Sequence, residues 1–174
     1  VIEFLIERMV SAGIDKIFIN TAEDKSDLIR YLSTKSIYKD NLIYMVRERK
    51  GLLDGIICPE KFLKEEDELF FGLPDTIWYP KNAFTQIDNK QGELVLGLFD
   101  TGTPERFDNV VIDVNNKIKS INVKVPNPKT KWTWAIGKMT VKVARLLKPN
   151  PLFGVSMNEY CQKHSGYAVE LSGS

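Results

Sequence analysis

The sequence is short of the residues from which most redox and metal sites are built. Among its 174 residues there are two cysteines and one histidine. Cys58 and Cys161 lie far apart in the sequence, which argues against a C-x-x-C metal or redox site and predicts two reduced, buried thiols. Any catalytic triad or multi-histidine site would have to use His164, so we expect a solvated or structural histidine there.

Long apolar runs and glycine-rich phosphate motifs are also absent. No run approaches the roughly 20 residues of a membrane span, and Glu3, Glu7 and Arg8 make the first stretch unlike a signal peptide. The sequence contains no P-loop, G-x-G-x-x-G or G-x-S-x-G. We therefore expect a cytoplasmic protein whose phosphate chemistry, if any, uses local groups. Because the first helical pattern starts without a cap, we expect the native chain to continue upstream.

An excess of one charge is missing as well. The 24 Lys and Arg residues balance 23 Asp and Glu residues, giving a net charge of +1. Such a balance supplies no overall field that would attract nucleic acid or an anionic membrane, so we expect neither as a partner. The sequence contains no linker or repeat, and its length suits one domain. We expect residues 1–174 to form a single domain, while self-association into a homo-oligomer stays open.

Apolar periodicity predicts alternating helices and strands. An amphipathic stripe predicts a helix over residues 1–12 that ends at Gly13, and Ser26 is a candidate cap for a second helix. Asn115-Asn116 predicts the turn of an antiparallel hairpin. We expect an α/β fold with a mixed, mostly parallel sheet, helices on both faces, and ligands beyond the carboxyl ends of the strands. The predicted strands lie at 15–20, 41–48, 68–75, 92–100, 109–114, 119–125 and 167–171, and further helices at 82–88 and 158–166.

Few side chains stand out as candidates for chemistry. Asp75 follows a buried strand in FFGLPDTI, where it could ligate Mg²⁺ or serve as a turn or cap aspartate. Trp132 and Trp134 alternate in KWTWAIG, which suits either a sugar-stacking surface or the packing of two aromatics under a helix. Gly137 could admit a ligand close to the backbone or start the following helix.

These segments, taken in order, resemble the sugar-1-phosphate nucleotidyltransferase family, which includes glucose-1-phosphate thymidylyltransferases. VIEFLIERMVSAGIDKIFINTA, RERKGLLDGI, FFGLPDTI, LGLFDTGTPERFDNVVIDVNNKIKSINVKVP and WTWAIGKMTVKVARLL carry the resemblance. It implies a Rossmann-like nucleotide-diphospho-sugar transferase fold. It also implies the reaction of the family, in which a sugar-1-phosphate attacks the α-phosphate of a nucleoside triphosphate and releases pyrophosphate.

The resemblance also implies roles for individual residues. By its motifs, Gly51 would bind the nucleotide, Asp75 would bind Mg²⁺ as a catalytic residue, Lys124 would bind the sugar phosphate as a second catalytic residue, and Gly137 would bind the sugar. The family's Gly-rich loop would lie before residue 1 and its second metal-binding aspartate after residue 174. Val123 stands where the motif has glutamate, which suits an alternative function as a non-catalytic nucleotide-sugar-binding or assembly domain.

Overall fold

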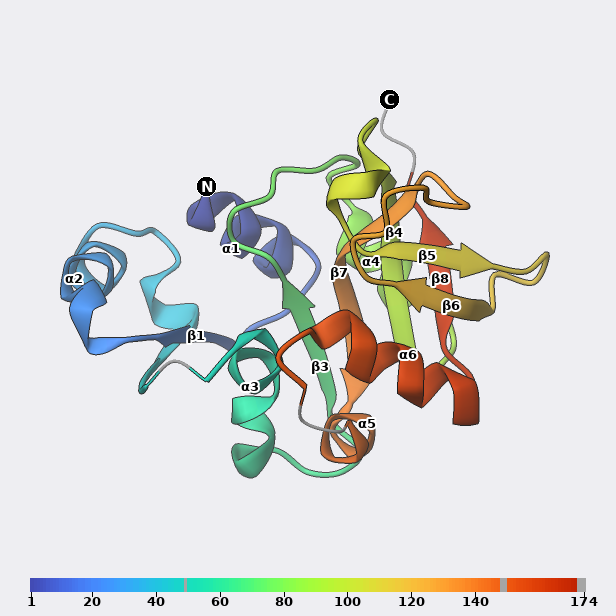
Figure 1. Cartoon of the computed structure of the whole chain (residues 1–174). Coiled ribbons are helices and arrows are strands. Elements are labelled where there is room, and N and C mark those ends of the chain that lie inside the picture. The colour runs from blue at the N-terminus through green and yellow to red at the C-terminus, as the bar shows by residue number, and fades with distance from the viewer. Residues whose placement is uncertain (49, 148–149, 172–174) are drawn as a thin grey trace.

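The computed structural model describes residues 1–48, 50–147 and 150–171, and its helices and strands alternate along the chain (Figure 1). The helices are α1 (Ile2–Ser11), α2 (Ser26–Thr34), α3 (Leu52–Ile57), α4 (Ala83–Asp88), α5 (Val141–Leu146) and α6 (Phe153–Lys163). The strands are β1 (Ile17–Thr21), β2 (Leu42–Val46), β3 (Glu68–Gly72), β4 (Leu94–Asp100), β5 (Asn109–Ile112), β6 (Ile118–Asn122), β7 (Trp132–Thr140) and β8 (Tyr167–Glu170).

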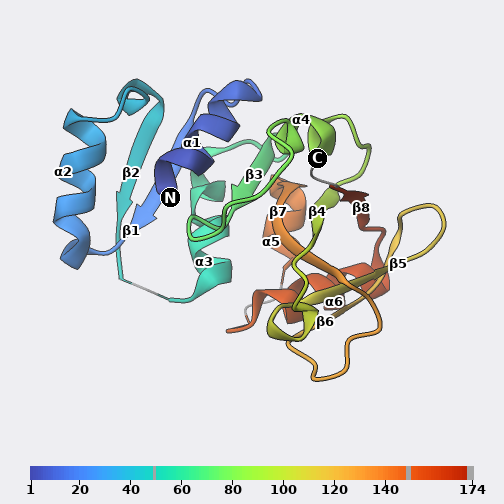
Figure 2. The same ribbon diagram turned by 90° about the horizontal axis from the view of Figure 1, so that it is seen from above.

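Two sheets are formed by the described strands. β1 and β2 make a parallel pair, in which Ile17 lies opposite Leu42. The other strands form a six-stranded sheet in the order β6-β5-β7-β4-β8, with β3 paired to β7 as well. β4 follows one edge of β7, while β3 and β5 pair with successive parts of its other edge. The β1–β2 pair lies to one side of the larger sheet (Figures 1 and 2).

The predicted α/β class, the mixed sheet and the hairpin between β5 and β6 are confirmed. The expectation of a mostly parallel sheet is wrong for the larger sheet. There, β4 and β8 form the one parallel pair between the described strands. The reason is β7, which runs opposite to β3, β4 and β5 and so makes all of its pairings antiparallel.

Buried side chains of β4 alternate between two hydrophobic clusters, one on each face of the large sheet. Leu94, Leu96 and Leu98 belong to the cluster that contains residues of α5 and α6, whereas Val95 and Phe99 belong to the cluster that contains residues of α1 and α4. This alternation follows from the two-residue period of a strand. Helices therefore cover both faces of the sheet, as predicted.

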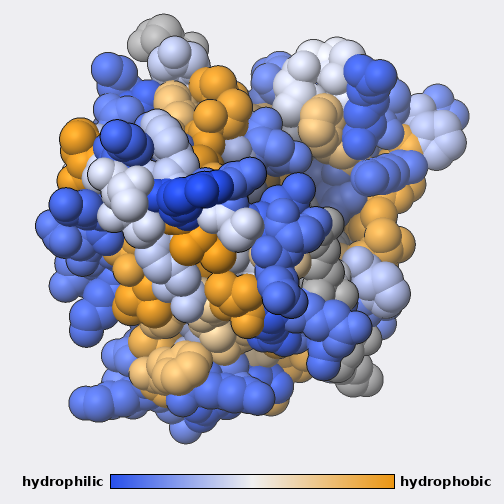
Figure 3. All heavy atoms as spheres, turned by 90° about the vertical axis from the view of Figure 1, so that its left-hand side faces the viewer, coloured by the Kyte–Doolittle hydropathy of each residue, from blue (hydrophilic) through white to orange (hydrophobic). Residues whose placement is uncertain are grey.

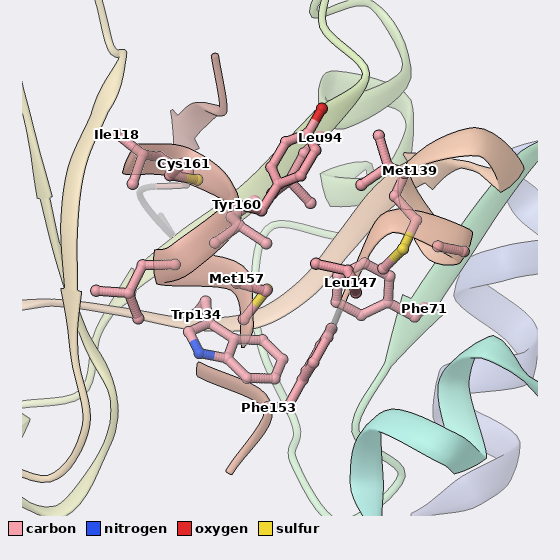
Figure 4. Packing of buried hydrophobic residues seen from close by; sticks show 14 of the residues in the cluster. Phe71, Leu94, Ile118, Trp134, Met139, Leu147, Phe153, Met157, Tyr160 and Cys161 are labelled. Carbon is pink, nitrogen blue, oxygen red and sulfur yellow. The ribbon is translucent and has the colours of Figure 1, made fainter. Parts of the chain in front are cut away.

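The first cluster is built around aromatic rings that meet edge to face. Ring centroids of Phe71 and Phe153 lie 5.6 Å apart, and those of Trp134 and Phe153 lie 5.4 Å apart (Figure 4). Such edge-to-face pairs are the favoured geometry for buried aromatics. The rings come from β3, β7 and α6, so they tie the last long helix to the middle of the sheet.

Helix α1 connects the two sheets. Its side chains Ile6 and Met9 are buried in the same cluster as Ile19 of β1 and Ile136 of β7. Leu5 lies so close to Gly72 of β3 that a Cβ there would be 2.8 Å from the Leu5 side chain. The small parallel pair is thus attached to the large sheet through this helix and the side chains around it.

Two predicted details of the helices differ from the structure. Ser26 does not cap α2 through its side chain, because the helix begins at Ser26 itself and Lys25 occupies the cap position. α6 begins at Phe153, five residues before the predicted start at 158, since Phe153 and Met157 form a buried stripe with Tyr160. The predicted end of α1 is confirmed, with Gly13 at a φ of 87°. Among the described helices, none combines the length and the apolar character that crossing a membrane requires.

Candidate functional site

A hollow of about 320 Å³ lies where the parallel strands β1 and β2 end. The carboxyl ends of parallel strands are the usual ligand site of α/β sheets. Of the side chains that line this hollow, three are cationic and one is anionic, so its charge favours an anionic ligand. The lining residues are Asn20, Thr21, Ala22, Lys25, Arg47, Glu48, Lys50 and Gly51.

Gly51, predicted to bind a nucleotide, lies in the wall of this hollow. Its φ of 108° and ψ of 174° belong to a region that side chains rarely allow, which explains glycine at this position. No heavy atom lies within 4 Å of the place a Cβ would take, so the backbone is open on that side. The structure thus brings Gly51 to a hollow, and the nucleotide remains a prediction.

Arg47 and Asp54 form an ion pair beside Gly51 that the sequence analysis missed. Nη2 of Arg47 lies 2.8 Å and 2.7 Å from the two carboxylate oxygens of Asp54. The Cys58 thiol is a further neighbour of this guanidinium, and burial raises the pKa of that thiol. The opposite charges of Arg47 and Asp54 on either side of Gly51 were the available signal in the sequence.

Asp75 lies beyond the carboxyl end of β3, as predicted, and its side chain is exposed. The Thr76 hydroxyl donates a hydrogen bond of 3.2 Å to its carboxylate. Within the described residues, no group of three or more His, Cys, Asp and Glu side chains could hold a metal ion. One open carboxylate fits Mg²⁺, which usually takes one or two protein carboxylates and completes its shell with water and phosphate oxygens. Asp75 therefore suits a magnesium ion that arrives with a phosphate-bearing substrate.

Lys124, predicted to bind the sugar phosphate, is exposed just after β6 and has a φ of 45°. Its charge acts on Asp108, a partly buried carboxyl group at the start of β5 that the sequence analysis did not single out. Burial raises the pKa of Asp108, and the Trp134 N–H and the Lys124 charge partly offset this rise. The Trp134 N–H nevertheless lacks the geometry of a full hydrogen bond. Asp108 also packs against α6, where its carboxylate would collide with a Cβ on Gly154.

Gly137, predicted to bind the sugar, lies in the middle of β7 and is buried. A Cβ at this position would lie 2.6 Å from Cζ of Phe71 and 2.8 Å from the main-chain oxygen of Val95. Close packing by β3 and β4 is therefore enough to require glycine here. The structure places no open surface beside this missing side chain, and the role in sugar binding stays a prediction.

For Trp134 the structure favours packing over sugar stacking. The side chain is 6% exposed and lies against Phe71 and Phe153. Trp132 is only partly buried, and Nζ of Lys131 lies 4.7 Å from its ring centroid. One ring of the pair therefore belongs to the core, while the other keeps a partly open face.

The structure agrees with the predictions of a structural histidine and two buried, free thiols. The His164 ring stacks on Tyr160 with centroids 4.7 Å apart at the end of α6. Cys58 and Cys161 are free and buried. Burial raises the pKa of Cys161 to about 12, which leaves its thiol protonated and inert at neutral pH.

The predicted site residues are not all in contact with one another. Among the described residues, no hydrogen bond or ion pair joins Gly51, Asp75 and Lys124. They instead follow three different strands, β2, β3 and β6.

Comparisons with solved structures show how widely this fold occurs. A glucose-1-phosphate thymidylyltransferase of Bacillus anthracis in complex with sucrose is 22% identical, with a TM-score of 0.84, over 99% of this chain and 74% of the other. A UDP-glucose pyrophosphorylase complexed with UDP-glucose is 16% identical, with a TM-score of 0.78, over 99% of this chain and 79% of the other. At these identities the likeness establishes the Rossmann-like fold. A search of curated proteins found no match.

A comparison with protein families extends this result from the fold to the family. The family described as nucleotidyl transferase matches residues 1–147. This match covers most of the chain and includes the hollow at Gly51, the strand end at Asp75, and Lys124 after the hairpin. The chain therefore belongs to the nucleotidyl transferase family.

Proposed function

We propose that this protein transfers a nucleotidyl group from a nucleoside triphosphate to a sugar-1-phosphate, giving an NDP-sugar and pyrophosphate. The observation that carries the proposal is the family match over residues 1–147, which spans a positively lined hollow and an exposed strand-end carboxylate. Enzymes with this reaction in their names share the fold.

The nucleotide occupies the hollow at the ends of β1 and β2 in this proposal. The volume of the hollow, about 320 Å³, lies at the lower end of the usual range for ligand pockets and is enough for a base and part of a ribose. Gly51 allows the nucleoside to approach the backbone, because no side chain stands in the way. Lys25 and Lys50 line the same hollow and add positive charge that would attract the phosphates.

Asp75 is the proposed ligand of Mg²⁺. When bound, Mg²⁺ neutralises charge on the phosphate oxygens as the α-phosphate reacts. Asp75 contributes an exposed carboxylate on a turn that follows β3, and a main-chain hydrogen bond of 3.1 Å from Leu73 to Ala135 fixes the start of that turn. The Thr76 hydroxyl, which donates to the same carboxylate, holds its orientation.

Lys124 is proposed to bind the phosphate of the sugar substrate, and Gly137 to lie near the sugar. In the reaction an oxygen of the sugar phosphate forms a bond to the α-phosphorus, and the bond from that phosphorus to the bridging oxygen breaks. Pyrophosphate leaves with the electron pair. An ammonium group at the sugar phosphate lowers the repulsion between the two reacting anions, which is the main task in such a transfer.

A non-catalytic nucleotide-sugar-binding or assembly domain is the second candidate function. The observation that favours it is Val123, whose side chain lies 3.0 Å from where a Cβ on Gly154 would be. The position that carries glutamate in the family's motif thus holds an apolar side chain packed towards α6. A domain of this kind would keep the ligand but lose the reaction.

Product analysis separates the two candidates. The protein is incubated with each of ATP, GTP, CTP, UTP and dTTP, together with glucose-1-phosphate and Mg²⁺, and the NDP-sugar and pyrophosphate are quantified. We expect product with at least one nucleotide, and a loss of at least about a hundredfold in rate for Asp75→Asn, because the variant keeps the shape but removes the charge of the metal ligand.

Asp40→Asn is the matched control, since Asp40 is an exposed carboxylate before β2, outside the proposed site. Its activity should equal that of the unchanged protein. Binding of nucleotide without product, measured by isothermal titration, would support the non-catalytic domain. An absence of both binding and product from the folded protein would contradict both candidates.

The setting of the reaction is also proposed from the sequence and structure. We place it in the cytoplasm, where the free thiols Cys58 and Cys161 would stay reduced. We treat residues 1–174 as one domain of the enzyme, with no role for nucleic acid or a membrane. Self-association of the domain is a question for sedimentation.

A further inference from the structure

One edge of β7 passes from β3 to β5 at Trp134. On one side of this residue, the main-chain nitrogen of Leu73, directly after β3, donates a hydrogen bond of 3.1 Å to the oxygen of Ala135. On the other side, Asn109 of β5 lies opposite Thr133. One segment of the chain therefore leaves the sheet after Leu73, and another enters it at Asn109. We call this place the fork.

Two aspartates flank the fork. Asp75 follows Leu73 by two residues, and Asp108 directly precedes Asn109. Asn109 is fully buried, and its Nδ2 donates a hydrogen bond of 2.7 Å to the oxygen of Pro104. This bond fixes the start of β5, so Asp108 has a defined position at the fork.

The carboxylate of Asp108 is partly buried, yet its hydrogen-bonding capacity is not used within the protein. Among the described residues, none donates a hydrogen bond of full geometry to it, and the buried indole N–H of Trp134 approaches it but stays without a partner. Neither oxygen of the carboxylate is completely buried. Both oxygens can therefore accept hydrogen bonds from a ligand.

Lys124 is the cationic neighbour of this carboxylate. Oδ2 of Asp108 and Cγ2 of Val123 both lie within 3.0 Å of the place that a Cβ on Gly154 would take, so the two side chains meet at α6. Lys124 directly follows Val123, and its charge acts on Asp108. Val123 stands where the motif has glutamate, and the fold nevertheless brings a carboxylate beside it.

An ammonium group with a carboxylate beside it suits the two parts of a sugar-1-phosphate. Phosphate oxygens carry negative charge, so they bind the ammonium group and are repelled by a carboxylate. Sugar hydroxyls can donate hydrogen bonds, which an ionised carboxylate only accepts. The carboxylate is therefore complementary to the sugar ring and not to its phosphate.

The fold keeps this carboxylate at a cost in stability. Burial raises the pKa of Asp108, which means that the charged form is less favourable in the folded protein than in the unfolded chain. A titratable group in an unfavourable setting, next to a proposed substrate ligand such as Lys124, is typical of functional sites.

We infer that Asp108 is a specificity-determining residue, which accepts hydrogen bonds from hydroxyl groups of the sugar whose phosphate Lys124 binds. This inference rests on the proposed function, since it takes Lys124 as the site of the sugar phosphate. It adds a residue that recognises the sugar through its side chain, which the proposed reaction leaves open.

Isothermal titration of sugar-1-phosphates and inorganic phosphate tests the inference. The 1-phosphates of glucose, galactose, mannose and N-acetylglucosamine are each compared with inorganic phosphate, which has no sugar hydroxyl. We expect the best of the four to bind more tightly than inorganic phosphate. Asp108→Ala should weaken the binding of that sugar phosphate on the order of tenfold to a hundredfold, the loss typical of a hydrogen bond to a charged group. Inorganic phosphate should bind this variant at least as tightly as the unchanged protein.

Further variants separate recognition of the sugar from other roles. Asp108→Asn keeps the shape of the side chain, and it should also lose preference for the sugar phosphate while its urea midpoint at pH 7 stays equal or rises. A residue with only a structural role would lower that midpoint instead. Lys124→Gln should weaken the sugar phosphate and inorganic phosphate by the same factor, because it removes the charge that both ligands use.

Glu105→Gln is the matched control, since it removes an exposed carboxylate from the same loop, three residues before Asp108. Its dissociation constants should equal those of the unchanged protein. Circular dichroism confirms that each variant is folded.

Deoxy analogues identify the hydroxyl without changing the protein. The 2-, 3-, 4- and 6-deoxy forms of the best sugar phosphate are titrated into the unchanged protein and into Asp108→Ala. At least one analogue should bind the unchanged protein about as weakly as the complete sugar phosphate binds the variant. For that analogue the two losses should not add, because they remove the same hydrogen bond.

The outcomes separate the inference from the proposed function. Sugar phosphates that bind Asp108→Ala as tightly as the unchanged protein, or no more tightly than inorganic phosphate, overturn the inference and leave the proposed reaction standing. Losses that add for every deoxy analogue overturn it as well. An absence of binding by the sugar phosphates and by inorganic phosphate overturns the proposed phosphate site at Lys124, and the inference with it.

Discussion

The small parallel pair and the large sheet of this protein are packed very differently. We call β1, α2, β2 and α3 the N-terminal layer, and β3 to β8 the central sheet. Every residue of β4 except Asp100 is buried, whereas no residue of β2 is fully buried. Ile43 and Val46 of β2 are 40% and 52% exposed. The central sheet therefore holds most of the apolar burial that stabilises the fold.

The less buried region is also the one that carries the hollow and the ion pair of Arg47 with Asp54. Figure 3 looks at the side of the molecule where α2 and β1 lie, and hydrophobic side chains reach the surface there between hydrophilic ones. Strand ends that are not covered by other elements leave backbone and polar groups available to a ligand. The comparison teaches that the nucleotide end of the proposed site lies in the less buried region, whereas Asp75 and Lys124 follow strands of the central sheet.

The largest expected difference between the two regions is the cost of removing an aromatic ring. Phe71→Ala in the central sheet should lower the free energy of unfolding by about 3–5 kcal/mol, because the ring is 4% exposed and packs against two others. Phe62→Ala, in the short 3-10 helix that follows α3, should cost less than about 1 kcal/mol, since that ring is 70% exposed. Urea unfolding measures both. Equal losses would contradict the division into two regions.

Thiol labelling tests the same division through local opening. Cys58 directly follows α3 of the N-terminal layer, whereas Cys161 lies on α6, which packs on the central sheet, and burial raises the pKa of each thiol. We expect Cys58 to react with a disulfide reagent at pH 8 about tenfold faster than Cys161, because less buried regions open at lower free energy. Variants that keep one cysteine, Cys58→Ala and Cys161→Ala, assign the rates. Faster labelling of Cys161 would reverse the proposed order of stability.

The smallest effect concerns Asp108, the partly buried acid directly before β5. Burial raises the pKa of Asp108, so the folded protein binds the proton up to a higher pH than the unfolded chain does. The free energy of unfolding therefore falls as the pH rises from the pKa of Asp108 in the unfolded chain to its higher pKa in the folded protein, and it stays lower at higher pH. Asp108→Asn removes the free-energy cost of keeping a charged carboxylate partly buried. The variant should therefore gain stability relative to the unchanged protein between pH 4 and pH 7.

Urea midpoints at several pH values measure this gain. Asp40→Asn, an exposed change in the N-terminal layer, serves as the control and should follow the unchanged protein within about 0.5 kcal/mol at every pH. If the curves of Asp108→Asn and the unchanged protein run parallel, the carboxyl group does not carry the predicted cost.

Local structure could be predicted from the sequence, and the order of strands could not. The stripe of α1, the turn at Asn116 and the end of α1 at Gly13 all depend on neighbouring residues, and all are confirmed. The direction of β7 depends on which strands meet in space, since a two-residue period says only which side chains share a face. For the same reason, Trp132 and Trp134 could be assigned to one face but not to the core.

The candidate site shows the same limit. Asp75 was recognised because a strand, a turn and a carboxylate follow one another in the sequence. The pair of Arg47 and Asp54 arises from the approach of a strand end to a helix, and Asp108 gains its surroundings from β7 and α6. Contacts that form only after folding are hard to predict from a single sequence. For the pair of Arg47 and Asp54, the sequence shows only two opposite charges around Gly51.

The contact between Phe71 and Gly137 has a consequence for how this protein can change over evolutionary time. The ring occupies the space into which any side chain at position 137 would project. A mutation at 137 alone therefore meets a barrier. The main-chain oxygen of Val95 stands 2.8 Å from the same place, so a smaller residue at 71 would not by itself make room for a methyl group, and glycine is expected to persist at 137 in lineages where residue 71 varies.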